Sequence, residues 1–406
     1  TRALELAGIT AGTPDPVDGR IERDEHGRPT GMLQEGAVGL VGRLLPEITG
    51  ADLERALLRA QYKLHSLGIT AWQDALVGSA FGMPDIYDVY RNAAASGALT
   101  ARVRGALWWD RERGAEQIEE LLGRRRHGRI GRFDPGTVKI MQDGIIESRT
   151  AALIDPYLNP HTGAAACGCG AGGGAGDLDR GLSFVDPALL PGYVTALDRH
   201  GFQVHFHALG DRAVREALDA VEAARSANGD SAHRHHLAHL QVVHPDDVPR
   251  FKRLGATANI QPLWAAHEPQ MDELAIPILG PERATWQYPF GELLRSGVTL
   301  AAGSDWPVSS PDPLAGIHVA VNRAHPGSGG EPFLPGQRLT LAEALTAYTA
   351  GSAWANHLDD TGALKVGDRA DLAVLDRDPF AGAAGQIHET RVVATFVDGV
   401  QVWNRG

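Results

Sequence analysis

Apolar residues recur at helical spacing along much of the chain, and a short apolar run follows each such stretch. In the first example the apolar positions are Leu53, Leu57, Ala60, Leu64 and Leu67. Gly68, a suitable residue to end a helix, separates them from the strand-like segment "ITAWQDA". The spacing therefore predicts a helix that begins near Asp52 and is followed by a short strand.

The same unit of helix and strand recurs six more times. Further helices are expected near residues 84–97, 114–126, 187–200, 211–225, 245–254 and 289–296. The strands after them are expected in "ARVRGALWW", "GTVKIMQDG", "FQVHFHALG", "RHHLAHLQ", "ATANIQP" and "VTLAAGSD". Alternating helices and buried strands indicate a parallel sheet with right-handed crossovers.

Seven strands, each preceded by a helix, leave two α/β folds open. A closed (β/α)8 TIM barrel has eight strands, so this chain can supply strands two to eight of a barrel. An open, doubly wound sheet of seven strands is the alternative. We favour the barrel, and we expect its first strand to be missing from this chain.

Two segments depart from the repeated unit. Residues 1–50 are rich in Gly, Pro and Asp, which predicts a loop-rich cap region. Residues 161–181 are a low-complexity stretch of Gly and Ala, too flexible to predict as a regular element. Both cysteines, Cys167 and Cys169, lie in this stretch, where we expect an exposed loop rather than a metal site.

The C-terminal part changes from helical to strand periodicity. After a helix expected over 340–352, the segment "ADLAVLD" alternates with period two, and "RVVATFVDGVQVWN" predicts a hairpin that turns at Asp398-Gly399. An isolated hairpin is only marginally stable, so these strands need others to pair with. We predict a barrel domain over residues 1–352 and, over 353–406, the C-terminal part of a composite β-sandwich domain.

Composition and charge narrow the class of protein. Hydrophobic residues make up 43% of the chain and charged residues 22%, which is ordinary for a globular protein. The formal net charge of −12 disfavours a nucleic-acid partner. No apolar run reaches the roughly 18–20 residues of a membrane helix. Because a Cys-x-Cys pair is poorly placed for a disulfide, we expect a cytoplasmic protein. A homo-oligomer stays open.

Four residues suited to metal binding or proton transfer follow predicted strands. They are Lys139, His207, His239 and Asp305, at the ends of the expected fourth, fifth, sixth and eighth barrel strands. Catalytic groups of a parallel barrel lie where these carboxyl ends converge, and imidazole with carboxylate suits zinc. Each residue also has a structural interpretation on its own, such as a hydrogen-bonded core histidine or a turn that caps a helix.

The sequence resembles amidohydrolase family 3, the branch that contains the N-substituted formamide deformylase. The resemblance is carried by "RALELAGIT", "VKIMQDGIIESRTAAL", "VHFHALGDRAVREALDAV", "HHLAHLQVVHPDDVPRFKRLG", "NIQP", "GSDWPVSSPDPLAGIHVAVNR", "LTLAEALTAYTAGSA" and "GALKVGDRADLAVLDRDPF". It implies a metal-dependent hydrolase barrel that binds one or two divalent ions, with zinc expected. It also explains a lysine among ligands, because a lysine carboxylated by carbon dioxide is a carbamate whose oxygens can bridge two metals.

Carried over residue by residue, the resemblance implies the metal ligands Lys139, His207, His239 and Asp305, with Asp305 also the catalytic base. The sequence departs from the family at Ala238, where a Glu often precedes the histidine; in a strand Ala238 points away from His239, so we expect that ligand to remain. The His-x-His motif of the family's first barrel strand is expected to be missing. His205, two residues before His207, is interpreted as lying one layer deeper in the barrel, either as a core residue or as one that supports the metal ligands.

The expected function is hydrolysis of carbon–nitrogen bonds other than peptide bonds, in a small amide, formamide or cyclic amide. Trp264, Trp306 and Arg323 lie near the strand-end loops and are expected to line the substrate pocket, with ordinary packing as the alternative. Two other functions stay open. One is a catalytically incomplete barrel fragment or binding module that lacks the first-strand ligands, and the other is a hydrolase with a single metal ion.

Overall fold

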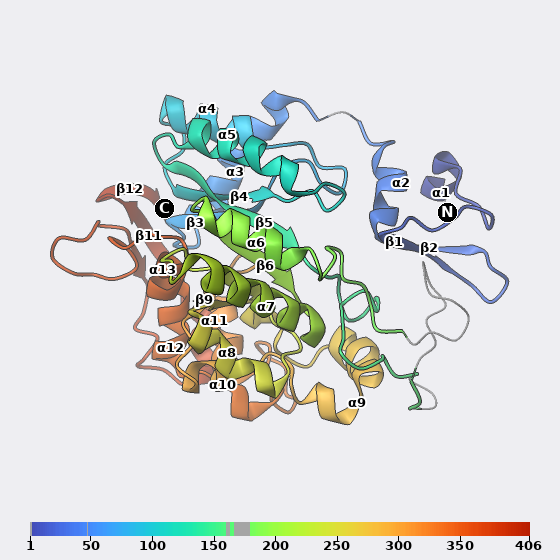
Figure 1. The fold of residues 1–406 in the computed structure, drawn as a ribbon. Helices are drawn as coiled ribbons and strands as arrows, with labels where there is room; N and C mark the ends of the chain where they lie inside the picture. The colour runs from blue at the N-terminus through green and yellow to red at the C-terminus, as the bar shows by residue number, and fades with distance from the viewer. Residues whose placement is uncertain (1, 47, 160–162, 166–178) are drawn as a thin grey trace.

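The structure is a computed structural model, and it describes residues 2–46, 48–159, 163–165 and 179–406 (Figure 1). Its main sheet has seven parallel strands that follow one another in chain order. They are β3 (Ala71–Val77), β4 (Arg102–Trp108), β5 (Phe133–Met141), β6 (Gln203–Ala208), β7 (His236–His239), β8 (Thr257–Ile260) and β9 (Leu300–Ala302). Cys167 and Cys169 lie outside the described residues.

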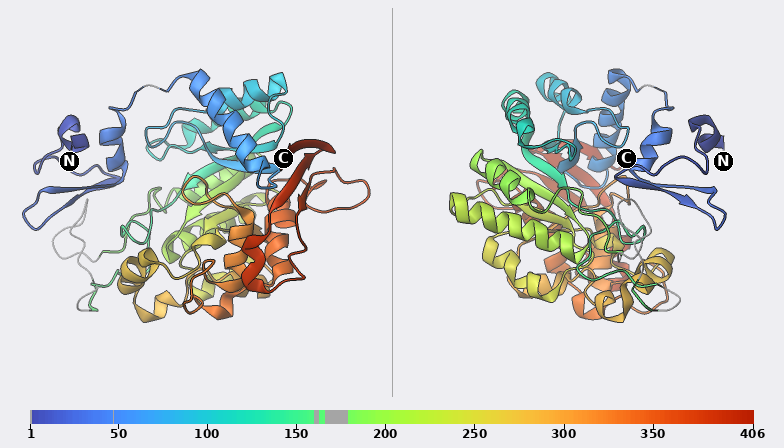
Figure 2. Two further views of the ribbon diagram at one scale, coloured as in Figure 1. Left: turned by 180° about the vertical axis from the view of Figure 1, so that it is seen from behind. Right: turned by 45° about the vertical axis from the view of Figure 1, so that its right-hand side comes forward.

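One helix precedes each of these strands, as the apolar spacing predicted. In order they are α3 (Gly50–His65), α4 (Tyr87–Ser96), α5 (Ile118–Gly128), α6 (Leu190–Arg199), α7 (Asp211–Asn228), α8 (Val248–Leu254) and α10 (Phe290–Arg295). Additional helices are α9 (Ile276–Ala284), α11 (Pro313–Asn322), α12 (Leu341–Thr346) and α13 (Ser352–Ala355). Figure 2 shows the sheet curled, with helices α4 to α8 along its outer side.

The strand order decides between the two predicted α/β folds. A doubly wound sheet reverses its strand order at a switch point, whereas here every strand from β3 to β9 pairs with the next one in the chain. The doubly wound alternative is therefore wrong, and the fold is an α/β barrel-like fold of the TIM type. Strands β3 and β9 form the two edges, and within the described residues neither pairs with the other.

Local sequence signals account for the first helix of this series. The Thr49 side chain accepts a hydrogen bond from the main-chain N–H of Asp52, and the Asp52 side chain accepts one from the N–H of Thr49, which forms a capping box. Leu57 and Leu64 lie on the buried side of α3. Gly68, with a φ of 80°, supplies the left-handed backbone that follows the helix.

Strand β6 separates an apolar outer face from a polar inner face. Val204 and Phe206 are fully buried in the main hydrophobic core, which also contains residues of α6 and α7. Gln203, His205 and His207 alternate with them and so face the inside of the curled sheet. The alternation anchors the strand through its outer face, and it leaves the inner face for polar side chains.

The N-terminal region contains more regular structure than the loop-rich cap that its composition predicted. It consists of α1 (Arg2–Ala7), the antiparallel strands β1 (Gly19–Arg23) and β2 (Pro29–Glu35), and α2 (Gly39–Gly42). Its own small apolar cluster contains Leu4, Ile9, Ile21 and Ala37. Figure 1 shows this unit beside the barrel rather than inserted into the main sheet.

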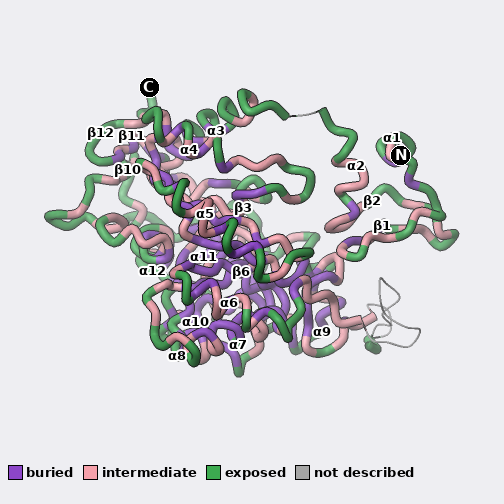
Figure 3. The backbone as a smooth tube through the Cα atoms, turned by 45° about the horizontal axis from the view of Figure 1, so that its top comes forward, coloured by how far each residue is buried: buried purple, intermediate pink, exposed green. Residues whose placement is uncertain are grey.

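The three C-terminal strands confirm the predicted strand and hairpin. They are β10 (Leu372–Leu375), β11 (Val392–Val397) and β12 (Val400–Asn404), paired antiparallel in that order. The turn residues Asp398 and Gly399 both have positive φ, of 50° and 76°, which matches a two-residue Asp-Gly turn. Strands β10 and β12 of this sheet carry exposed residues, whereas the barrel strands carry none (Figure 3). The sheet contacts the barrel where the Thr395 hydroxyl donates to the His65 carbonyl at 2.6 Å.

None of the helices in the described part of the chain combines the length and the apolar character needed to cross a membrane.

A buried polar network ties α6 and α7 to the amino-terminal ends of β6 and β7. The Asp198 carboxylate accepts hydrogen bonds from His235 Nε2 at 2.9 Å, Ser231 Oγ at 2.6 Å and Asn228 Nδ2 at 2.8 Å. His235 Nδ1 in turn accepts from the main-chain N–H of Val204 at 3.0 Å. Burial alone raises the pKa of Asp198, but these three donors outweigh it and hold that pKa well below its usual range.

Replacing Asp198 by Asn should lower stability and remove part of its acid dependence. A carboxylate with a lowered pKa contributes stability above its unfolded pKa of about 3.9, and that contribution is lost as the pH falls. We expect Asp198→Asn to lose about 2 kcal/mol at pH 7 and to lose less additional stability than the wild type between pH 5 and pH 2. Urea unfolding at several pH values measures both effects; parallel pH profiles would contradict the assignment.

Candidate metal centre

The parallel register of β5 and β6 brings the predicted site residues to one face. Lys139 pairs with His205, and Met141 pairs with His207. Paired residues of neighbouring strands share a face, so the Lys139 and His205 side chains both enter the barrel interior. They lie one layer below His207, which is near the carboxyl end of β6.

Lys139 is buried and is held by a chain of polar side chains. Its Nζ lies 2.9 Å from His205 Nε2, and His205 Nδ1 lies 2.7 Å from Gln73 Oε1. An amide oxygen only accepts, so His205 Nδ1 carries the hydrogen and its Nε2 accepts from Lys139. The same Gln73 oxygen lies 3.2 Å from His236 Nε2, so β3, β5, β6 and β7 meet in this layer.

The two expected histidine ligands, His207 and His239, lie side by side. Their ring centroids are 4.4 Å apart. His239 has a φ of 81°, which takes it out of the regular strand alternation, and its N–H donates to Gln261 Oε1 at 2.8 Å. Trp264 stacks on the His239 ring with centroids 5.4 Å apart. His239 Nδ1 is buried without a hydrogen-bond partner among the described residues.

Asp305 follows β9 in a left-handed conformation, with a φ of 53°. Its negative charge acts on both Lys139 and His207, and it raises the pKa of each against a larger lowering by burial. The structure thus places His207 beside His239 and Lys139 one layer below them, and the charge of Asp305 acts on both Lys139 and His207.

Burial sets the charge state of this group. It lowers the pKa of Lys139 to about 8, against the attraction of Asp305. Burial, followed by the nearby charges of His239 and Lys139, holds the pKa of His207 well below its usual range. Burial and Lys139 do the same for His239. Both imidazoles are consequently neutral at pH 7, which is the form that binds metal ions.

These residues fit a divalent cation in part. Two neutral imidazoles, one with an unpartnered buried nitrogen, and a nearby carboxylate are suitable donors. Within the described ranges, however, no three His, Cys, Asp or Glu side chains form a group that could hold a metal ion. Lys139 in its charged form repels a cation, which works against metal binding at this position.

The three residues expected to line the substrate pocket differ in their surroundings. Trp264 stacks on His239, and Trp306, next to Asp305, is 40% exposed. Arg323 is fully buried; its Nε donates to the Phe333 carbonyl at 2.8 Å and its Nη1 to the Tyr288 carbonyl at 3.3 Å. In this structure Arg323 therefore joins the backbone at Phe333 to the backbone at Tyr288.

A cavity of about 260 Å³ lies between the N-terminal unit and the loops after β3 and β4. Its walls include Asp18, Glu35, Phe81, Trp108 and Arg111. Trp108 is the ladder partner of Lys139, so the cavity borders the strand end next to the candidate metal centre. Asp18 and Arg111 of this lining form an ion pair.

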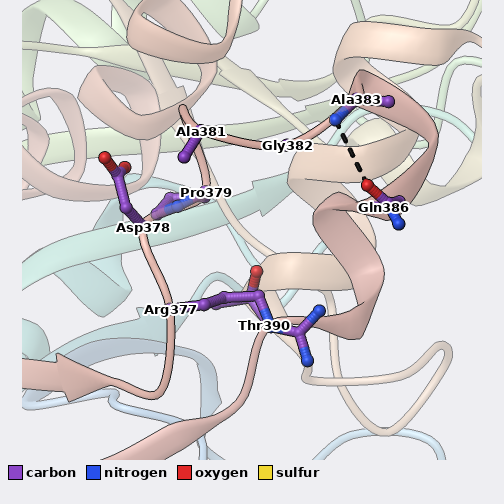
Figure 4. Close-up of a pocket in the computed structure, with 8 residues that line it drawn as sticks. All are labelled: Arg377, Asp378, Pro379, Ala381, Gly382, Ala383, Gln386 and Thr390. Atoms are coloured by element: carbon purple, nitrogen blue, oxygen red, sulfur yellow. Dashed lines mark hydrogen bonds between the residues drawn. The ribbon is translucent and has the colours of Figure 1, made fainter.

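A second cavity, of about 270 Å³, lies in the C-terminal segment (Figure 4). It is lined by Arg377, Asp378, Pro379, Ala381, Gly382, Ala383, Gln386 and Thr390. The main-chain N–H of Ala383 donates to Gln386 at 3.3 Å on its rim. Its lining contains none of the four predicted ligands, so we assign it no part in the chemistry.

Several residues of the site were not singled out from the sequence. Gln73, His236 and Gln261 contact the histidines, and Asp143 lies beside His207 with Oδ1 3.9 Å from the Nε2. The available signal was a polar residue at an inward position of an apolar strand, as in "AWQDA" and "RHHLAHLQ". That signal does not say which polar residues meet across the barrel.

Comparison with known proteins identifies the class. The sequence profile of the amidohydrolase family matches residues 1–403, so the chain belongs to this family, as the motifs predicted. It is 31% identical to protein LONG AFTER FAR-RED 3 of Arabidopsis thaliana, and the alignment covers 99% of this chain and 66% of that protein. The family confirms the predicted class of enzyme, a hydrolase of carbon–nitrogen bonds.

Further relatives agree with this assignment. The chain is 29% identical to the putative amidohydrolase YtcJ of Bacillus subtilis, and 27% identical to the N-substituted formamide deformylase of Arthrobacter pascens. These alignments cover 99% of this chain and 71% and 70% of the relatives, so the chain spans about two thirds of their length. An uncharacterized metal-dependent hydrolase from Pyrococcus furiosus superposes with a TM-score of 0.67 at 26% identity, over 93% of this chain and 69% of that one.

Replacing Lys139 by Met should stabilise the metal-free chain at neutral pH. The pKa of about 8 lies below the usual 10.5, so the unfolded chain binds more protons and stability rises with pH between these values. The shift corresponds to about 3 kcal/mol of destabilisation at pH 7, which the variant should recover in large part.

Urea unfolding with a chelator present, at pH 7 and pH 9.5, measures this effect. Lys63→Met, at an exposed position of α3, is the matched control and should leave the free energy of unfolding unchanged at both pH values. A Lys139→Met variant that is less stable than the wild type at pH 7 would show that the buried ammonium is well compensated.

Proposed function

We propose that this protein hydrolyses a carbon–nitrogen bond other than a peptide bond in a small amide, formamide or cyclic amide. The observation that carries the proposal is the contact between the His207 and His239 rings at the strand ends, with buried Lys139 one layer below and the charge of Asp305 acting on Lys139 and His207. The name of the Arthrobacter pascens relative, an N-substituted formamide deformylase, favours a formamide or another N-substituted amide.

The proposed cofactor is one or two divalent metal ions, with zinc favoured by the imidazole and carboxylate donors. His207, His239 and Asp305 would hold the metal, together with Lys139 after its carboxylation. The neighbour from Pyrococcus furiosus, titled a metal-dependent hydrolase, supports metal use. Carboxylation replaces the cation of Lys139 by an anion, which removes the repulsion noted above.

In the proposed mechanism Asp305 is the catalytic base. A bound divalent ion acidifies water and polarises a carbonyl. Asp305 takes the proton from the attacking water and delivers it to the leaving nitrogen. The buried position of Lys139 and the packing of Trp264 on His239 limit the access of bulk water to this group.

For the substrate we propose a position between the metal ligands and the cavity beside Trp108. Trp264 and Trp306 lie next to His239 and Asp305, and they are proposed to line the pocket as predicted. The Arg323 guanidinium is enclosed, so we propose that it supports the pocket by holding the backbone at Phe333 and Tyr288 rather than by contacting the substrate.

The barrel is proposed to have an eighth strand position between β9 and β3 that the described residues do not fill. Both edge strands have a free side there, within the part of the chain that the structure describes. We retain the proposed barrel domain over 1–352 and the composite β-sandwich domain that includes 353–406. A cytoplasmic location, the lack of a nucleic-acid partner and a homo-oligomer likewise stay predictions.

A catalytically incomplete barrel or binding module is the second candidate, favoured by one observation. The described residues contain no ready group of three metal-binding His, Cys, Asp or Glu side chains. For these residues alone we expect at most one weakly held metal ion. Metal analysis combined with a panel of amide substrates separates a two-metal hydrolase, a one-metal hydrolase and a binding module.

Replacing Asp305 by Asn should abolish most of the turnover of the enzyme. The amide keeps the shape of the side chain and removes its basicity, so kcat should fall at least about 10²-fold. Asp312→Asn is the matched control on the same loop. Asp312 caps α11 by accepting from the Leu314 N–H, and Asn caps equally well, so its turnover should not change. Near-normal turnover of Asp305→Asn refutes its role as base.

Added bicarbonate should raise the activity of enzyme that is stripped and then reloaded with metal, if Lys139 must be carboxylated. Lys139→Ala should bind less metal and should not respond to bicarbonate. A crystallographic map of the metal-loaded protein is the direct measurement. A full complement of metal beside an unmodified Lys139 ammonium would contradict this part of the proposal.

A further inference from the structure

Asp143 joins two loops at the carboxyl ends of β5 and β6. It is fully buried, and its carboxyl group accepts three main-chain hydrogen bonds. Oδ1 accepts from Leu209 at 3.0 Å, and Oδ2 accepts from Gly210 at 2.8 Å and from Ala152 at 2.9 Å. One side chain therefore satisfies the backbone of the turn after β6 and of the segment around Ala152.

The same stretch of chain contacts His207 directly. The Gln142 N–H donates to the His207 carbonyl at 3.1 Å. His207 Nε2 lies 3.3 Å from the Gly144 carbonyl oxygen and 3.9 Å from Asp143 Oδ1. Residues 142–144 thus fix His207 at its backbone, at its ring and at the turn that follows it.

Close packing leaves this arrangement little freedom. A Cβ added to Gly210 would lie 2.0 Å from the Ala152 carbonyl oxygen. A Cβ added to Gly144 would lie 2.0 Å from Thr150 Oγ1 and 2.7 Å from Glu35 Oε1. Both backbones are therefore closely packed, and the three hydrogen bonds of Asp143 belong to the same packed arrangement as the turn that follows His207.

We propose that Asp143 is a positioning residue for the metal ligand His207. By holding the turn at Leu209 and Gly210, it fixes the depth and the orientation of the His207 ring at the mouth of the barrel. Asp143 acts through His207 and touches no reacting atom. The inference rests on the proposed function in one respect, namely that His207 is a metal ligand.

Asparagine is the informative replacement at this position. An ionised carboxylate accepts on both oxygens, whereas an amide accepts on one and presents an NH2 group at the other. In Asp143→Asn that NH2 faces a main-chain N–H of Leu209, or those of Gly210 and Ala152. At least one hydrogen bond is lost and replaced by two opposed donors, which displaces the turn without leaving a large cavity.

Asp198→Asn is the matched control. Asp198 is also buried and also accepts three hydrogen bonds, but it lies at the opposite ends of the strands, away from His207. Both variants should lower the melting temperature. Only Asp143→Asn should change metal binding if Asp143 positions the ligand, whereas a merely structural role predicts the same behaviour for both.

The experiment measures Co²⁺ and Zn²⁺ affinity of the chelator-stripped protein by competition with a chromogenic chelator, beside thermal unfolding followed by circular dichroism. We expect Asp143→Asn to weaken affinity at least about 10-fold, because loss of an outer partner of a ligand typically costs 10–100-fold. Asp198→Asn should stay within about twofold of the wild type. Unchanged affinity in Asp143→Asn, or an equal loss in both variants, overturns the proposal.

A second measurement keeps the proposal testable if the wild type binds no metal or if Asp143→Asn does not fold. If the wild type binds neither ion, the proposed metal centre fails, yet the ring position can still be tested by ¹⁵N–¹H correlation of the His207 imidazole, assigned with His207→Ala. The resonance should shift in Asp143→Asn and not in Asp198→Asn; no shift overturns the proposal.

If Asp143→Asn is unfolded, hydrogen exchange of the wild-type protein is measured with and without Zn²⁺. Zn²⁺ should slow exchange at the Leu209 and Gly210 amides, because their turn is joined to the ligand His207. Unchanged exchange overturns the proposal.

Discussion

The parallel register between β5 and β6 is the constraint on which the site depends. It sets Lys139 beside His205, and it places His207 one layer above them. On the other side of the same strand, Val204 and Phe206 are fully buried in the main hydrophobic core. A slip of one residue would exchange these two sets, and it would place imidazoles in the apolar layer and aliphatic groups in the barrel interior. Core packing therefore specifies the chemistry at the mouth.

Much of the barrel could be predicted because its signals are local. Leu57 and Leu64 at helical spacing, Thr49 as a cap and the period-two pattern of β6 are all properties of short segments. The N-terminal hairpin was predicted as loops, since strands β1 and β2 are short and rich in turn-forming and charged residues. Its pairing and its small apolar cluster become visible only in three dimensions.

Some residues of the candidate site could likewise be selected from the sequence, whereas others become visible only in the structure. Lys139, His207, His239 and Asp305 follow apolar strands at positions where a barrel carries its chemistry, and the motifs of the family select them as the proposed ligands. The contribution of Asp143 could not be inferred, because its partners are main-chain N–H groups that any sequence possesses. Likewise, nothing in the sequence around Arg323 distinguishes a pocket residue from one enclosed between backbone carbonyls.

The Gln73 side chain has a consequence for how the molecule moves. Strand β3 pairs only with β4 among the described strands, and most of its residues are half-buried. Through Gln73 it also bonds to His205, His236 and Asn356. Because β3 is an edge strand, local unfolding can release it while the rest of the barrel stays folded. Detachment of β3 would also withdraw the Gln73 oxygen that accepts from His205 Nδ1. His205 would then lose the hydrogen bond that orients its ring beside Lys139.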